Sequence, residues 1–420
     1  MKKTLYLLLL WGATLGINAQ KPATLQQLET NQRRTYGTDF PYSYEKRTLT
    51  KAPKGYKPFY ISHYARHGSR YYWTSELYKD LEKQLTEANK QQCLTPIGRD
   101  FYEKFMKAKD ELHASVGELS DLGWEQHQFI ARTMYNEFKD VFKKGGNVLA
   151  ISSLSGRCVL SMSAFCQELV QCNPEIEIRE QSSRTTLDGV VPTDEQNPHH
   201  RSFPRSKPRY EANRKNFKYA NDIRPAIIER VFTNTDGLTS KPHTIANNLI
   251  NLYTSLPSIG HEGMMEGIIS DEEIASRWEG ENLGTYSWVF GPRYDMIPIL
   301  RDIINKADNV IKGNTDRVAD LRFGHDTCLG PLTILMGING ADSDPEDPYK
   351  VKNIYQNWQT AKAANLQFIF YRSNKDGKEI LVKCLQNGFE ASLPLPTDNY
   401  PYYKWSDFKQ FYTERCNAVK

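Results

Sequence analysis

The sequence has little of what metal sites, nucleic-acid surfaces and membrane spans require. No two cysteines stand at C-x-x-C spacing, and the segment nearest to a zinc-binding helix, residues 261–266, carries a His-Glu pair without the second His of H-E-x-x-H. The 54 Lys and Arg nearly balance the 50 Asp and Glu, so the net charge is only +4. Such a balance creates no broad field to hold a nucleic acid or an anionic membrane. We therefore expect no metal ion, no cofactor and no nucleic-acid partner.

Long hydrophobic runs are also missing, with one exception near the N-terminus. An apolar run over about residues 4–17 follows Lys2 and Lys3, and it is shorter than the roughly 20 residues of a spanning helix. This pattern predicts a signal segment, residues 1–19, that is cleaved after Ala19, and no Cys follows to carry a lipid. Because the two lysines leave with the segment, the net charge falls from +4 to +2. We expect no membrane span and a periplasmic or secreted mature protein.

Cysteine is scarce, at seven residues in 420. An exported chain folds in an oxidising compartment, so some pairing is expected. The number is odd, however, and a chain of this length has enough apolar sequence to build its core without disulfides.

The length of the chain also exceeds one typical domain and predicts two structural units.

Three segments share a pattern in which a β-prone run stops at Gly, Ser or charged residues, and two of them lead straight into a helix. This pattern is typical of an open α/β sheet. Ligands bind such sheets at the carboxyl ends of the strands, so we expect the three strand ends to converge on one site. The predicted strands are residues 58–65, 147–153 and 319–323, followed by polar residues 66–70, 155–157 and 324–326 and by helices over 158–172 and 329–336.

A long polar stretch, residues 180–312, separates the second and third strands and holds few strand-like runs. It predicts a mainly helical cap inserted into an α/β core of residues 20–179 and 313–420. Near the C-terminus, residues 364–371 and 379–386 flank an Asn-Lys-Asp-Gly turn signal and predict a hairpin at one edge of the sheet. Cap helices are expected near 222–232, 244–253 and 294–310, with helices over 75–90 and 95–116 beside them.

Residues 66–70 read Arg-His-Gly-Ser-Arg and follow the first predicted strand. Two guanidinium groups around one imidazole suit a tetrahedral oxyanion, because Arg binds phosphate oxygens through paired, charge-assisted hydrogen bonds. His67 can attack phosphorus only if its reactive nitrogen is unprotonated, and neighbouring backbone carbonyls are expected to hold the proton on the other nitrogen. The alternative, an Arg-rich surface loop, fits less well with the strand context and the second arginine.

A second histidine and a carboxylic acid follow the third predicted strand, where residues 324–327 read Gly-His-Asp-Thr. Cleavage of a phosphate ester needs a proton on the leaving oxygen, and general acid catalysis makes this step roughly 10²–10⁴-fold faster. Asp326 is the candidate donor, since nearby negative phosphate raises the pKa of a carboxyl group. The alternative is structural, with Asp326 or Thr327 as the cap of the following helix.

Together these motifs resemble the histidine acid phosphatase branch of the histidine phosphatase superfamily, and the resemblance covers most of the mature chain. The family pattern R-H-G-x-R matches residues 66–70, its His-Asp pair matches His325 and Asp326, and its third arginine matches Arg157. Residues 119–126 resemble the L-T-x-x-G-x-x-Q segment of the family, with Ser in place of Thr.

The resemblance implies a fold and a role for each matched residue. The fold is α/β, an open mixed sheet flanked by helices, with a phosphoglycerate mutase-like core and an inserted, mainly helical cap. His67 is the nucleophile that forms a phosphohistidine, Asp326 protonates the leaving group, and no metal is required. The residues that clamp the substrate phosphate are Arg66, Arg70, Arg157 and His325.

Within that family, residues 152–159, 163–165 and 323–325 look most like the multiple inositol polyphosphate phosphatases. The chain departs from them at residues 325–327. The multiple inositol polyphosphate phosphatases usually have His-Ala-Glu there, whereas this chain reads His-Asp-Thr, as the bacterial periplasmic phytases and acid phosphatases do. We expect a small-molecule phosphate ester as substrate, either inositol hexakisphosphate (phytate) or a sugar phosphate cleaved by a broad acid phosphatase. A phosphate-ester binding protein without turnover is the remote alternative, against which the nucleophile and the proton donor argue.

Residues 199–224 are strongly basic, with eight Lys or Arg and only two acidic residues, Glu211 and Asp222. A polyanion such as phytate needs cations beyond those that hold the scissile phosphate, which makes this segment a candidate for its other phosphates. A solvated charged loop is the equal alternative. The eight are Arg201, Arg205, Lys207, Arg209, Arg214, Lys215, Lys218 and Arg224.

Overall fold

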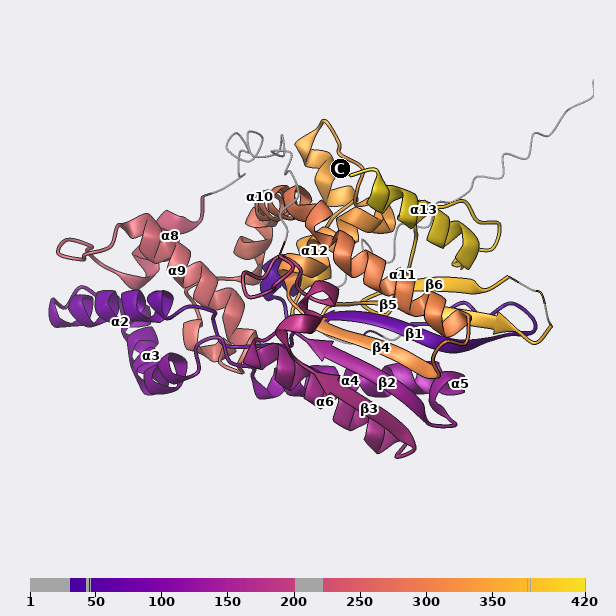
Figure 1. Ribbon diagram of the computed structural model, residues 1–420. Helices are drawn as coiled ribbons and strands as arrows, with labels where there is room; N and C mark the ends of the chain where they lie inside the picture. The colour runs from indigo at the N-terminus through magenta and orange to yellow at the C-terminus, as the bar shows by residue number, and fades with distance from the viewer. Residues whose placement is uncertain are drawn as a thin grey trace, which may run out of the picture.

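A computed structural model describes residues 31–42, 45, 47–200, 222–375, 377 and 379–419. The strands are β1 (Tyr56–Arg66), β2 (Gly146–Ser152), β3 (Ile176–Gln181), β4 (Arg317–Gly324), β5 (Asn365–Ser373), β6 (Leu381–Gln386), β7 (Phe389–Ala391) and β8 (Tyr402–Lys404). They form one sheet in the order β3-β2-β4-β1-β5-β6-β7, with β8 paired to β6 (Figure 1). The pairs from β3 to β1 are parallel and the pairs from β1 to β5 onward are antiparallel. The open mixed sheet that the motifs implied is confirmed.

The three predicted strands are β1, β2 and β4, and they lie side by side in the middle of the sheet. The predicted hairpin is β5 and β6, but β7 and β8 pair with β6, so the hairpin does not form the edge itself. Strand β3 was not predicted. Only Ile176 of its residues is buried, and an edge strand that lies mostly in solvent carries no apolar run for the sequence to reveal.

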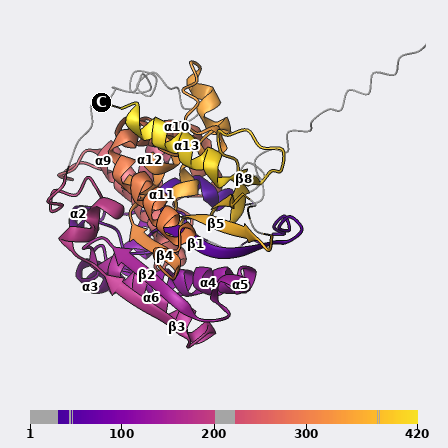
Figure 2. The same cartoon turned by 45° about the vertical axis from the view of Figure 1, so that its right-hand side comes forward.

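Helices cover both faces of the sheet. Successive residues of a strand point to opposite faces, so Tyr60 and Tyr64 of β1 pack with one group of helices and Ile61 and Ala65 with the other. Figure 2 shows α11 and α13 over one face and α4 and α6 over the other. The helices are α2 (Ser75–Lys90), α3 (Pro96–Ala114), α4 (Asp121–Glu137), α5 (Lys139–Phe142), α6 (Gly156–Cys172), α8 (Arg224–Val231), α9 (Pro242–Ser255), α10 (Asp271–Phe290), α11 (Ile297–Ile311), α12 (Asp326–Met336) and α13 (Trp405–Asn417).

A second apolar cluster joins α2, α3, α8 and α9 at one end of the sheet (Figure 1). All four helices lie where the sequence predicted helix. The predicted helix near 294–310 is α11, which packs on the sheet through Ile299, Ile303 and other apolar residues. The boundary between core and cap remains a prediction.

Helix α10 was not predicted, although it is 20 residues long. Its N-terminus has a capping box, in which Ser270 and Glu273 each bond the backbone N–H of the other. Its buried residues include Asn282 and Ser287 beside Ile274 and Leu283. Polar and apolar residues are therefore mixed on the buried side, and no clean apolar stripe marks the helix in the sequence.

Short 3-10 helices connect these elements. Two of them lie beside the strand ends, and they are η1 (Gln32–Asp39) and η8 (Asn357–Thr360). The others are η2 (Arg184–Gly189), η3 (Leu256–Ser258), η4 (Glu262–Met265), η5 (Gly291–Met296), η6 (Ile338–Gly340) and η7 (Pro348–Asn353).

The cysteine prediction is wrong in part, because all seven thiols are free in the structure. Five of them are buried and pack as small apolar groups, so the core needs no cross-link to close. They are Cys158, Cys166, Cys328, Cys384 and Cys416.

Two sequence predictions lie outside the described residues. These are the signal segment, residues 1–19, and most of the basic segment, of which residues 201–221 are not described. Among the helices that are described, none combines the length and hydrophobicity needed to cross a membrane.

Candidate active site

The carboxyl ends of β1, β2 and β4 meet at one edge of the sheet. Arg66 is in register with Gly324, and the backbone N–H of His67 donates to the Gly324 carbonyl at 3.0 Å. The rings of His67 and His325 consequently lie 5.6 Å apart, centroid to centroid. Ser152 of β2 is in register with Phe323, which places the start of α6 beside both histidines. Segments far apart in the chain thus share one polar cluster.

His67 is buried and held in a single tautomer. Its Nδ1 lies 2.9 Å from the Gly68 carbonyl oxygen. Because a carbonyl only accepts, Nδ1 carries the proton and Nε2 keeps its lone pair. Burial, together with the charges of nearby cations, holds the pKa of His67 well below its usual range. The lowered pKa favours the neutral imidazole, which is the form that attack on phosphorus requires.

Three arginines surround this imidazole and act on its pKa. The Nη1 of Arg66 donates to the carbonyls of Thr38 and Thr360, at 2.6 and 2.8 Å. Arg70 donates to the Tyr71 carbonyl at 2.7 Å, and the Nη1 of Arg157 lies 3.5 Å from the Gly117 carbonyl oxygen. In the described part of the chain, the buried Nε groups of Arg66, Arg70 and Arg157 have no hydrogen-bond partner.

An unpartnered buried N–H costs free energy, and three such groups here belong to the arginines that surround one imidazole. A tetrahedral oxyanion offers several oxygens to such a set of donors. The cluster therefore offers the set of donors that binding of a tetrahedral oxyanion requires.

His325 directly follows β4 and is the N-cap residue of α12. Its Nε2 lies 3.0 Å from the Ser153 hydroxyl. Burial and then the charge of Arg157 lower the pKa of His325 to about 4, so this ring is also neutral in mild acid.

Asp326 is the first residue of α12 and forms an ion pair with Arg66 at 3.1 Å. The cap position is His325, whose side chain makes no capping bond, so the alternative of Asp326 or Thr327 as N-cap is wrong. Burial would raise the pKa of Asp326, but the cations Arg66, Lys362 and Arg70 outweigh burial and lower it. The carboxyl group is ionised until something offsets those cations.

The loop of residues 66–70 is braced by α4 and α6. Gly68 and Gly123 approach so closely that a Cβ on Gly68 would lie 2.3 Å from the Gly123 carbonyl oxygen. Gln126 accepts from the Ser69 backbone N–H at 2.8 Å, and Ser161 accepts from that of Gly68 at 3.1 Å. The Gly and Gln of residues 119–126 thus hold the loop that carries His67.

Gly123→Ala is expected to disturb this brace. A Cβ on Gly123 would lie 2.2 Å from the Ser69 carbonyl oxygen, which belongs to the backbone and not to a flexible side chain. We expect the free energy of unfolding to fall by about 1–3 kcal/mol, measured by urea denaturation. Gly263→Ala is the matched control, because a Cβ there meets nothing within 4 Å. Equal stability of the two variants would contradict the close approach.

Two charged residues beside the site carry no motif and were missed. Lys362 is buried, and its Nζ lies 2.7 Å from the Asp39 carboxylate. The one signal in the sequence is a lysine inside the run Ala361 to Ala364, directly before a buried strand, where a charge is unusual. Nothing in the sequence marks Asp39.

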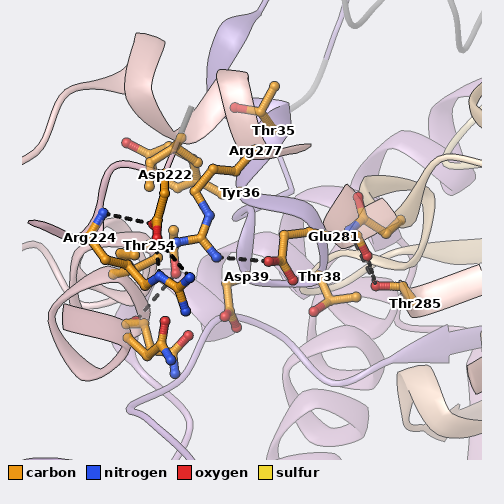
Figure 3. A pocket seen from close by; sticks show the side chains of 15 residues that line it. Thr35, Tyr36, Thr38, Asp39, Asp222, Arg224, Thr254, Arg277, Glu281 and Thr285 are labelled. Carbon is orange, nitrogen blue, oxygen red and sulfur yellow. Dashed lines mark hydrogen bonds and ion pairs between the residues drawn. The ribbon is translucent and has the colours of Figure 1, made fainter. Parts of the chain in front are cut away.

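A polar pocket of about 540 Å³, lined in part by Asp39, lies between η1, α9 and α10 (Figure 3). Its lining includes the ion pairs Asp222–Arg224 and Arg277–Glu281. None of the six predicted site residues is among the described residues that line it. Nor do three His, Cys, Asp or Glu side chains gather as metal ligands anywhere in the described ranges.

Comparison with known proteins identifies structural relatives only. No protein-family model matches the sequence. No curated protein sequence matches it either.

The fold, in contrast, matches solved structures over nearly the whole chain. The Bifidobacterium longum multiple inositol polyphosphate phosphatase in complex with inositol hexasulfate aligns with a TM-score of 0.68 at 19% identity, over 90% of this chain and 97% of that one. The phytase from D. castellii aligns with a TM-score of 0.66 at 16% identity, over 96% of this chain and 89% of that one. Hafnia alvei phytase in complex with tartrate aligns with a TM-score of 0.54 at 12% identity, over 87% of this chain and 99% of that one. The chain therefore has the fold of multiple inositol polyphosphate phosphatases and phytases, as its resemblance to the histidine acid phosphatases implied.

Proposed function

We propose that the protein is a phosphomonoesterase of the histidine acid phosphatase type, which acts through a phosphohistidine on His67. One observation carries the proposal: a buried, neutral imidazole with a fixed tautomer lies among three arginines whose buried Nε groups lack partners. The arginines bind and polarise a phosphate group, and Nε2 of His67 is the nucleophile next to it.

The first step forms the phosphoenzyme. The lone pair of Nε2 attacks phosphorus in line, the bond from phosphorus to the ester oxygen breaks, and Asp326 gives its proton to that oxygen. A dianionic phosphate bound to Arg66 and Arg70 offsets the cations that hold the pKa of Asp326 low. Substrate binding thereby raises this pKa and supplies the protonated donor.

The second step returns the enzyme to its starting state. The Asp326 carboxylate takes a proton from water, the water oxygen attacks phosphorus, and the bond from phosphorus to Nε2 breaks. Inorganic phosphate leaves and His67 is again neutral. The charge in both steps is stabilised by arginine side chains, which supply what metal ions supply in other phosphatases.

We propose inositol polyphosphates as the substrates, with export directed by residues 1–19. The solved relatives with the same fold are an inositol polyphosphate phosphatase and phytases, which supports this substrate class. The basic segment of residues 199–224 supplies further cations in the sequence. Arg224, the member of it that the structure describes, pairs with Asp222 at 2.8 Å and so contributes less than a free cation.

Phosphate release tests this function. Purified mature protein at mildly acid pH is expected to release phosphate from phytate faster than from glucose 1-phosphate or a small aryl phosphate. Excess chelator is expected to leave the rate within about twofold, because no step uses a metal ion. A clear preference for the monophosphates would assign the runner-up, a broad acid phosphatase, and loss of activity in chelator would contradict the mechanism.

A further inference from the structure

We propose that Lys362 and Asp39 form a positioning pair for this reaction, which fixes Arg66 against the proton donor Asp326. The inference rests on the proposed phosphatase function and names two residues that no motif contains. Neither residue touches the reacting atoms, so both act through Arg66.

The backbone around Lys362 is tied directly to the nucleophile loop. Lys362 lies between η8 and β5, and the N–H of Ala363 donates to the His67 carbonyl at 2.8 Å. The N–H of Arg66 in turn donates to the Ala364 carbonyl at 2.9 Å. Any shift of this loop therefore moves the backbone that carries Arg66 and His67.

The side chain of Lys362 shares an acceptor with Arg66. Its Nζ lies 2.7 Å from Asp39 and 3.4 Å from the Thr38 carbonyl oxygen, which also accepts from Arg66 at 2.6 Å. The Nη2 of Arg66 then reaches Asp326 at 3.1 Å. A continuous chain of polar contacts thus runs from Asp39 to Asp326.

A buried lysine in this position is unfavourable for stability alone. Burial and then the charges of Arg66 and Arg70 lower the pKa of Lys362 to about 7, against the attraction of Asp39. An apolar side chain of similar length would pack there without that cost. A charge retained against burial and against two like charges, next to a candidate acid, indicates a functional role.

Lys362 also adds to the cations that favour the ionised form of Asp326. Removing its charge should raise the pKa of Asp326, so the donor keeps its proton to higher pH. Other ionisable groups also face Asp326, and they stay in place in the variants below. They are Arg66 at the end of β1, Arg70 from the loop that follows it, His325 between β4 and α12, Cys158 from α6, Cys328 from α12, and Tyr355 from the segment after η7.

The test compares pH profiles of kcat on phytate for Lys362→Met and Asp39→Asn. We expect kcat at the optimum to fall about 10- to 100-fold through misplacement of Arg66, with a smaller change in KM. For Lys362→Met we also expect the alkaline limb of the pH profile to move up by about 0.5–1 pH unit, because this variant removes a cation that favours the ionised form of Asp326. Lys362→Arg should return the limb toward its wild-type position, because it restores the charge.

Lys352→Met is the matched control, since Lys352 forms a surface ion pair with Glu279 at 2.9 Å. Folded variants with wild-type kcat and an unmoved limb would overturn the proposal, even if their melting temperatures fall. If Lys362→Met does not fold, the kcat of Asp39→Asn decides, because Asp39 is less buried. A wild-type protein without phosphatase activity would instead refute the proposed function itself.

Discussion

His67→Ala is expected to abolish phosphate release, with a fall in kcat of roughly 10⁴-fold or more. The variant removes the nitrogen that forms the bond to phosphorus. His325 is the other imidazole in the cluster, but its Nε2 is already engaged with the Ser153 hydroxyl at 3.0 Å. It is therefore not free to replace the nucleophile. Initial rates on phytate and on an aryl phosphate measure the loss.

Binding should survive this substitution, because the arginine cluster is intact. We expect inorganic phosphate to protect His67→Ala against thermal unfolding about as well as it protects the wild type. His243→Ala, at an exposed position of α9, serves as the control and should keep full activity. A His67→Ala enzyme with more than a few per cent of wild-type kcat would exclude His67 as the nucleophile.

Asp326→Asn should slow the reaction by an amount that depends on the leaving group. For the alkoxide of an inositol phosphate, loss of the proton donor is expected to cost about 10²–10⁴-fold in the first step. A 4-nitrophenolate leaves without a proton, so that step should lose much less. Asp398→Asn, at an exposed position, is the control.

The same variant should also accumulate the phosphoenzyme. With 4-nitrophenyl phosphate the first step stays fast, while the second step lacks the carboxylate that takes the proton from water. Stopped-flow absorbance should therefore show a burst of about one nitrophenolate for each active site, followed by slow turnover. Equal losses for both substrates and no burst would contradict the role of Asp326.

The central strands and the candidate site could be predicted from the sequence because their signals are local. β1, β2 and β4 are short buried runs, and each stops at polar residues, so both the strand and its functional end are visible in one stretch. The rule that parallel strand ends share an edge then brings His67, Arg157 and His325 together without knowledge of the full topology.

Features that depend on contacts distant in sequence could not be predicted in this way. Lys362 and Asp39 are 323 residues apart, and only the fold brings them together beside Arg66. The close approach of Gly68 and Gly123 is likewise a property of the packed structure. β3 and α10 were missed because their own hydrophobic patterns are weak: β3 has only Ile176 and Ile178 as apolar residues, and α10 mixes polar and apolar residues on its buried side.

The stereochemical course at phosphorus tests the phosphohistidine mechanism most directly. A substrate whose phosphate is chiral through oxygen isotopes is cleaved by the wild type in the presence of an alcohol acceptor, and the configuration of the transferred phosphate is determined by NMR. Two successive in-line displacements, first by His67 and then by the acceptor, predict retention of configuration. Inversion would mean a single direct displacement and would contradict a covalent intermediate on His67.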